Sequence, residues 1–259
     1  MRNGIRILDT DTHQMEPPGM WAEYIDPKFA DRAPALGDLG GGRQGMMCEG
    51  ESLTRQDGAY PMHAPEWREA ATRAMLRFQR ARDTGFSPAS RLEDMDEQGV
   101  DAQVIYPTVG GQLLGRPFRD VDLLAASCRA YNDWSLEYCR ADDGRLRMAA
   151  MLPIQAPDLA IEEARRTAAL GAACYYVRPN PTAGRNFHHP DFEGLWRTIE
   201  DLGEVVQGGG FAFGFGRQQV FGVGMLGRLE HPRRRAVLDN LAALHNVDPI
   251  RDGADDGQI

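Results

Sequence analysis

The sequence predicts an α/β fold built on a parallel sheet. Segments with the pattern of buried strands alternate with segments of helical periodicity from residue 5 to residue 203, and several predicted helices are followed directly by glycine. Such alternation is typical of βαβ units, in which a helix connects two parallel strands. The 259 residues suffice for one large domain. The spacing alone leaves a closed barrel and an open doubly wound sheet as alternatives.

The first predicted strand is Ile5–Leu8, a short apolar run that leads into the polar segment Asp9–His13. No GxGxxG motif follows it, which weakens a dinucleotide-binding interpretation. Residues 17–88 come next and are rich in proline, glycine and methionine. We expect this segment to be an irregular insertion with one helical piece around Glu66–Arg82, because loops of such length usually carry function or are mobile.

Regular alternation begins after the insertion. Ser90 and Glu93 form a capping box, which predicts a helix that ends near Gly99. Proline in the first turn and glycine after the last turn delimit later helices. The later helices are predicted at Asp122–Arg140, Pro157–Leu170 and Pro190–Leu202, and the strands at Ala102–Tyr106, Leu146–Ile154, Ala172–Val177 and Glu204–Gln207.

The alternation stops after Gly203. The following segment is dense in glycine and phenylalanine, and glycine at that density weakens any strand or helix. We therefore divide the chain into a regular part (1–205, with the insertion at 17–88), an irregular segment (206–230), and a C-terminal helix with a frayed tail (231–259).

Composition excludes several classes of function. The net charge of -9 argues against a nucleic-acid partner, which recruits basic surfaces. The chain has no run of 18 apolar residues and no signal-peptide pattern at its start, so we expect neither a membrane helix nor secretion. Its 4 cysteines form no CxxC pair, which argues against a thiolate zinc site. Three of them lie in apolar helix- or strand-like contexts, and free buried thiols fit the reducing cytoplasm.

Asp11 and His13 are the sharpest chemical feature. Residues i and i+2 of a strand project to the same face, so both side chains would point to one side at the end of the first strand. A carboxylate oxygen and an imidazole nitrogen are sound ligands for zinc or a similar divalent ion. The alternative is structural: Asp11 caps a turn and His13 forms a local hydrogen bond.

The surroundings of this pair resemble the opening of the amidohydrolase-related family, which includes aminocarboxymuconate-semialdehyde decarboxylase and the aromatic-acid decarboxylases. The resemblance covers roughly residues 5–205. Its segments are Asp9–Pro18 with Trp21 and Asp26–Pro34, then Arg91–Asp96 through Thr108, Tyr131–Trp134, and Val177–Asn186 running into His189-Pro190 and Leu195-Trp196.

The resemblance implies a (β/α)₈ TIM barrel and a divalent metal, zinc first and manganese second. It also implies hydrolysis or decarboxylation of a small aromatic or carboxylated molecule. Asp11 and His13 match the family's first pair of metal ligands. The family's further ligands, a histidine after the fifth strand and an aspartate after the eighth, are not found: Gly208–Gly210 stand at the first position, and no segment supplies the second.

The chain is therefore expected to hold an incomplete barrel of about five βα units plus a glycine-rich tail, as a deleted or frameshifted gene would produce. Its catalytic residues stay unassigned. Two functions remain open: a metal-dependent amidohydrolase or decarboxylase, and a catalytically inactive remnant of that family. The expected partner is a small molecule, and a homo-oligomer is compatible with the open sheet edges that a partial barrel would leave.

Three further residues are candidates for substrate binding. Arg178 closes a predicted strand and could hold a substrate carboxylate, as arginine does well, or it could form an ion pair at the rim. His189 matches a loop above the family's pocket, or it caps the helix that follows. Glu16 lies near the metal pair, or it is a solvated loop acid.

Overall fold

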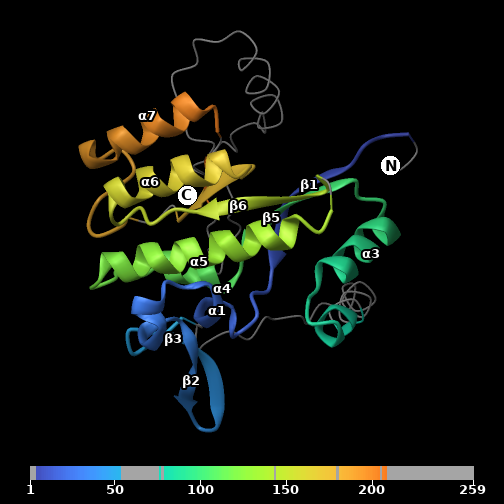
Figure 1. Ribbon diagram of the computed structural model, residues 1–259, viewed down its shortest axis with the longest axis horizontal. Coiled ribbons are helices and arrows are strands. Elements are labelled where there is room, and N and C mark those ends of the chain that lie inside the picture. The colour runs from blue at the N-terminus through green and yellow to red at the C-terminus, as the bar shows by residue number, and fades with distance from the viewer. Residues whose placement is uncertain are drawn as a thin grey trace, which may run out of the picture. The chain divides into compact units, whose positions relative to one another are not determined.

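The computed structural model describes residues 4–53, 76, 79–142, 144–178, 181–204 and 206–208 (Figure 1). Its main sheet has five parallel strands in the order β1-β5-β6-β7-β8, so each strand pairs with the next strand of this sheet along the chain. The predicted parallel α/β architecture is confirmed. The strands are β1 (Leu8–Gln14), β5 (Ala102–Pro107), β6 (Leu146–Met151), β7 (Cys174–Val177) and β8 (Val206–Gly208).

Helices connect these strands as predicted. In Figure 1, α5, α6 and α7 run side by side along the sheet, and contacts join α5 to α6 and α6 to α7. A short helix, α4, which the sequence patterns did not predict, follows β5 directly. The helices that connect or flank the strands are α3 (Pro88–Gln98), α4 (Val109–Leu114), α5 (Val121–Cys139), α6 (Pro157–Ala169), η3 (Pro190–Phe192) and α7 (Glu193–Leu202).

Helix α3 begins three residues before the predicted capping box. Its N-cap is Ser87, whose hydroxyl accepts a hydrogen bond from the Ser90 N–H, and Pro88 occupies the first turn. Proline has its φ fixed near the helical value and needs no N–H partner there, so it moves the start upstream of Ser90. The predicted end is confirmed: Gly99 closes the helix with φ 72°, a conformation that glycine adopts without strain.

A buried polar network joins α5, α6 and β6. The Asn132 side chain donates to the Met151 carbonyl and accepts from the Met151 N–H, at 3.0 and 2.7 Å. It also donates to Glu163, which is 3% exposed and is held by the Arg166 guanidinium at 2.7 and 2.9 Å. The segment Tyr131–Trp134 thus has a structural role, because its asparagine fixes both helices against the strand.

The first strand differs from its predicted position. The prediction took the apolar run Ile5–Leu8 as the strand, but Ile5 and Leu8 are 68% and 60% exposed, and β1 starts only at Leu8. The segment that pairs with β5 is the polar one, up to Gln14. Hydrogen bonding to β5 and burial near Gln14, rather than local hydrophobicity, fix the strand, so Asp11 and His13 lie inside β1.

The prediction of an irregular insertion is wrong for residues 20–52. They form α1 (Met20–Tyr24), the 3₁₀ helix η1 (Pro27–Arg32), and an antiparallel sheet of β2 (Ala35–Gly40), β3 (Arg43–Cys48) and β4 (Glu51–Ser52). The glycine run that suggested a loop is a tight hairpin turn, since Gly41 and Gly42 have φ 65° and 74°. Two consecutive residues with positive φ suit a two-residue β-hairpin.

Several predictions fall outside the described residues. They include most of the helical piece Glu66–Arg82, the irregular segment from residue 209 onward and the C-terminal helix. Within the described part of the chain, no helix has both the length and the apolar character needed to cross a membrane.

Candidate functional site

The candidate site lies where the parallel strands β1, β5 and β7 end. The carboxyl ends of parallel strands meet at one edge of a sheet, and α/β enzymes place their ligands there. At this edge the chain gathers a small set of polar and aromatic side chains, with α4 packed against several of them. They are Asp11, His13, Glu16, Tyr106, Tyr176 and Arg178.

Asp11 and His13 are brought together, as the i, i+2 spacing predicted. The His13 Nε2 atom lies 4.0 Å from the Asp11 Oδ1 atom. Asp11 lies within a β-bulge: Asp9 pairs with Gln103 and Thr12 with Ile105, so β1 has one residue more than β5 in this interval. Asp9 accepts hydrogen bonds from its pairing partner Gln103 at 3.4 Å and from the Asp11 N–H at 3.1 Å.

The tautomer of neutral His13 follows from its second ring nitrogen. Nδ1 lies 2.8 Å from the Pro107 carbonyl oxygen, which can only accept a hydrogen bond, so Nδ1 carries the proton. The lone pair of the neutral ring is then on Nε2, which faces Asp11. A main-chain carbonyl on one ring nitrogen is the usual way to orient a histidine for ligating a metal through the other.

Glu16 is buried, so the alternative interpretation of this residue as a solvated loop acid is wrong. Its side chain is 4% exposed and accepts main-chain hydrogen bonds from Thr108, Val109 and Gly110 at 2.9–3.0 Å. Burial raises the pKa of Glu16 to about 7, although these three N–H donors oppose the rise. The carboxylate thus anchors the start of α4, and its predicted contact with substrate stays a prediction.

Tyr176 lies against Gly111 of α4, and Arg178 lies against Gly115, the C-cap of that helix. A Cβ atom on Gly111 would come within 2.7 Å of the Tyr176 hydroxyl, and one on Gly115 within 3.3 Å of Arg178 Nε. Burial raises the pKa of Tyr176, a hydrogen bond with the Arg178 side chain lowers it, and the nearby carboxylates of Glu16 and Asp11 raise it. These effects place all four groups in one electrostatic neighbourhood.

The Arg178 guanidinium is partly unsatisfied. Its Nε and Nη1 atoms are buried, and neither has a hydrogen-bond partner in the described part of the chain. A buried guanidinium N–H without an acceptor is costly, because desolvation is not compensated. None of the salt bridges between described residues involves Arg178, so the alternative of an ion pair at the rim has no support there.

His189 lies elsewhere and acts locally. It is the N-cap of η3: its Nδ1 accepts from the Asp191 N–H at 3.3 Å, and its side chain is 43% exposed. This is the second of the two interpretations given for His189, a residue that caps the following helix. No contact between His189 and the residues of the candidate site is described, so its role toward a substrate stays a prediction.

The residues present fit a divalent metal only in part. Asp11 and His13 offer an oxygen and a nitrogen at one point, with the histidine oriented for ligation. Catalytic zinc needs three protein ligands and an open position. Among the described residues, no three histidine, cysteine, aspartate or glutamate side chains come together for a metal. The described chain therefore holds a half-site, and we derive no reaction step through a metal.

Some residues of this site were not singled out from the sequence. Tyr106 and Tyr176, with ring centroids 5.9 Å apart, line the strand ends. Gly111 lets α4 approach Tyr176, and Gly110 lets it approach Met151 and Glu16. The available signal was the pair of glycines just after a buried strand, which often marks a close approach of the backbone. The tyrosines gave no signal, because aromatic residues in a strand usually belong to the core.

Comparison with known proteins agrees with the fold. The model of the family described as amidohydrolase matches residues 10–245 of the chain. No curated protein matches it. Among solved structures, the chain is similar to an amidohydrolase from Mycobacterium avium subsp. paratuberculosis, with 20% identity, a TM-score of 0.57, and coverage of 78% of this chain and 58% of that one. The five strands are therefore part of a TIM barrel, and the chain spans little more than half of that relative.

Weaker similarities join two decarboxylases. The 2,6-dihydroxybenzoate decarboxylase from Rhizobium is 17% identical with a TM-score of 0.46, over 78% of this chain and 48% of that one. The dihydroxybenzoic acid decarboxylase from a Polaromonas species, which contains manganese and the inhibitor 2-nitroresorcinol, is 15% identical with a TM-score of 0.46, over 92% and 54%.

Proposed function

Because the chain belongs to the amidohydrolase family, we propose that it serves a metal-dependent hydrolase or carboxy-lyase reaction on a small, carboxylated aromatic molecule. Arg178 is the observation that carries this proposal. A buried guanidinium with two unsatisfied nitrogen atoms, at the end of a parallel strand, is suited to an anionic ligand. Arginine binds carboxylates through two parallel N–H groups, which gives geometric specificity as well as affinity.

The aromatic part of the proposed substrate is supported by the side chains beside Arg178. Tyr176 and Tyr106 are 1% and 2% exposed and lie with tilted rings, and the His13 ring lies 6.1 Å from the Tyr106 ring. Aromatic rings in tilted contact stabilise one another beyond the area that they bury, and the proposal extends this preference to the ring of the substrate. In this proposal Arg178 holds the carboxylate and the rings orient the aromatic plane.

Asp11 and His13 are the proposed metal ligands, for zinc or manganese. When bound, a divalent ion supplies Lewis-acid polarisation or an activated water, which is the chemistry common to hydrolysis and decarboxylation in this proposal. The contribution of this chain is to orient the His13 ring through Pro107 and to keep the carboxylate of Asp11 nearby. The buried, unpaired cysteines are consistent with the proposed cytoplasmic location.

A second candidate, an inactive member of the family, is favoured by the ligand count. Two ligands hold a metal weakly, and the described residues contain no third one. Such a chain would still bind a carboxylated ligand at Arg178, but it would not turn it over. The two candidates therefore share the ligand site and differ in metal content and activity.

A titration of benzoate into the full chain tests the shared site. We expect measurable binding for the wild type and at least tenfold weaker binding for Arg178→Met, since a charge-assisted hydrogen bond contributes about 1.5–3 kcal/mol. Arg197→Met is the control, because Arg197 is exposed and pairs only with Glu193 among the described ion pairs. Equal affinity in both variants would refute the carboxylate site, and metal content of the purified protein separates the two candidates.

A further inference from the structure

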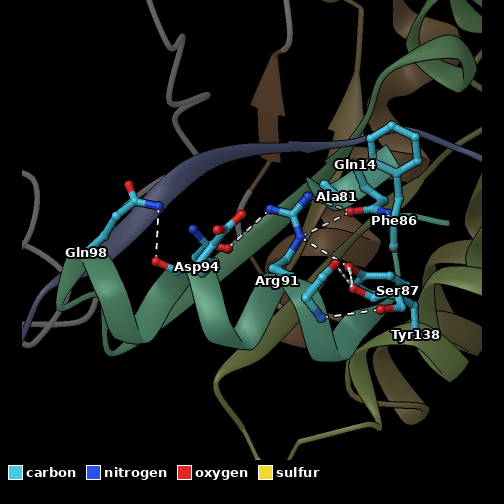
Figure 2. Close-up of a pocket in the computed structure, with 10 residues that line it drawn as sticks. Gln14, Ala81, Phe86, Ser87, Arg91, Asp94, Gln98 and Tyr138 are labelled. Carbon is cyan, nitrogen blue, oxygen red and sulfur yellow. Dashed lines mark hydrogen bonds between the residues drawn. The ribbon is translucent and has the colours of Figure 1, made fainter. Parts of the chain in front are cut away.

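Arg91, which the site described above does not use, lies directly behind His13. It extends from α3 into a polar cavity of about 100 Å³ lined by residues of α3, β1, β5 and α5 (Figure 2). In Figure 2 its guanidinium is at the centre of the polar side chains that surround the cavity. The cavity is on the side of β1 toward which Gln14 points.

The described contacts of Arg91 are all with neutral acceptors. Nη2 donates to the His13 carbonyl oxygen at 3.0 Å and to Gln14 Oε1 at 2.5 Å. Nε donates to Gln14 Oε1 at 3.1 Å and to the Tyr138 hydroxyl at 3.2 Å, and Nη1 donates to Gln103 Oε1 at 3.3 Å. The acidic residue beside it in the cavity, Asp94, is paired with Arg80. The contacts therefore fix geometry and do not neutralise a charge.

The geometry that they fix is that of a distorted strand. The bulge between Asp9 and Thr12 interrupts the pairing of β1 with β5, and the pairing resumes at Thr12, one residue before His13. A bulge bends a strand and increases its twist, so the direction of the next side chains is less determined by the sheet alone. Arg91 donates hydrogen bonds to both strands: to the His13 carbonyl and the Gln14 side chain of β1, and to the Gln103 side chain of β5.

We propose that Arg91 is a positioning residue for His13, which it holds by the main chain while Pro107 holds its ring. The two contacts act from different sides: the His13 carbonyl accepts from Arg91 at 3.0 Å, and its Nδ1–H donates to Pro107 at 2.8 Å. Loss of the first contact lets the backbone after the bulge relax, and the second then loses its geometry. The ring then no longer has a single tautomer with its Nε2 lone pair directed at Asp11.

This inference rests on the proposed function only in giving His13 a role as a metal ligand. The ring orientation itself can be measured without metal. The variants are Arg91→Met, which keeps the aliphatic stem, and Arg91→Lys, which keeps the charge but not the planar fork. Arg145→Met is the matched control: Arg145 also bonds α3, through Asp96, and donates to two main-chain carbonyls, but it does not contact His13.

The first readout is the ¹⁵N spectrum of the imidazoles at fixed pH in the full, metal-free chain, with His13 assigned by its loss in His13→Asn. We expect the Nδ1–H form in the wild type and in Arg145→Met, and a mixed or Nε2–H form in both Arg91 variants. The second readout is Mn²⁺ binding by electron paramagnetic resonance, which should weaken 10- to 100-fold in Arg91→Met, as is typical for loss of a group that orients a ligand.

The outcomes separate the two proposals. An unchanged His13 tautomer in a folded Arg91→Lys or Arg91→Met protein overturns the positioning role. If the tautomer changes but the wild type binds no Mn²⁺, the role of Arg91 stands and the metal site of the proposed function fails. An equal change of tautomer in Arg145→Met would also overturn it, because the effect would then follow from general loosening of α3.

Discussion

Glu16→Gln should change how stability depends on pH. The buried Glu16 carboxyl has a pKa of about 7 in the folded chain, against an ordinary value of 4.5. Between these values the folded chain keeps a proton that the unfolded chain releases, so the folded state binds more protons and the free energy of unfolding falls as the pH rises. At about 1.4 kcal/mol per tenfold change in proton affinity, the total is roughly 3 kcal/mol.

The assay is chemical denaturation at a series of pH values between about 4 and 9, for the wild type and Glu16→Gln. The glutamine cannot ionise. Its amide oxygen can keep part of the main-chain hydrogen bonds, and the loss of the others weakens the protein by an amount that does not vary with pH. The difference between the two proteins should therefore shift by roughly 3 kcal/mol toward the variant as the pH rises. Glu93→Gln, on the exposed face of α3, should leave the profile unchanged.

A constant difference between wild type and Glu16→Gln across this range would refute the reasoning. A shift in the opposite direction would show that the three N–H donors at the start of α4 outweigh burial and keep the carboxyl ionised. Either result would contradict a Glu16 pKa raised by burial.

Three other predictions concern packing and catalysis. Glu163→Ala should lower the free energy of unfolding in urea by about 1–3 kcal/mol, since it leaves the buried amide of Asn132 without one acceptor and leaves Arg166 paired with Asp133 alone among the described residues; a loss below 0.5 kcal/mol, on the order of an ordinary surface substitution, would contradict the network. Gly111→Ala should destabilise the fold by about 1–3 kcal/mol because its Cβ would meet the Tyr176 hydroxyl, whereas Gly19→Ala, which has open space, should be nearly neutral. The inactive candidate predicts little or no turnover with added Zn²⁺ or Mn²⁺; turnover that disappears in His13→Ala would overturn it in favour of the enzyme candidate.

The sequence was sufficient for the main sheet because its strands and helices follow strong local patterns. Helix α5 was predicted within one residue at each end, and Gly99 and Gly203 close their helices in the left-handed conformation that glycine favours. The first strand was misplaced because its polar half, rather than its apolar half, pairs with β5. Long-range pairing decided that position, and no local pattern reports it.

The candidate site was predicted in part for the same reason. The spacing of Asp11 and His13 predicted a common direction, and the structure has their side chains 4.0 Å apart. The positions of Glu16 and Arg178 depend on α4, a six-residue helix whose glycines make it a poor helix former by local propensity. Glu16 stabilises that helix from a distant part of the chain, so its existence could not be predicted from residues 109–114 alone.

The connection between β1 and β5 also bears on how the molecule assembles. The other strands of the main sheet are joined by shorter connections of one or two helices, whereas the hydrogen bond from His13 to Pro107 spans 94 residues. Closing a longer loop has a larger entropic penalty, and contacts distant in sequence form later during folding. We therefore expect β5, β6 and β7, which are close in sequence, to pair first, and β1 to add to the edge of β5 afterwards. If β1 docks last, Asp11 and His13 come together only in this step, so we expect the proposed metal-ligand pair to form after the rest of the sheet.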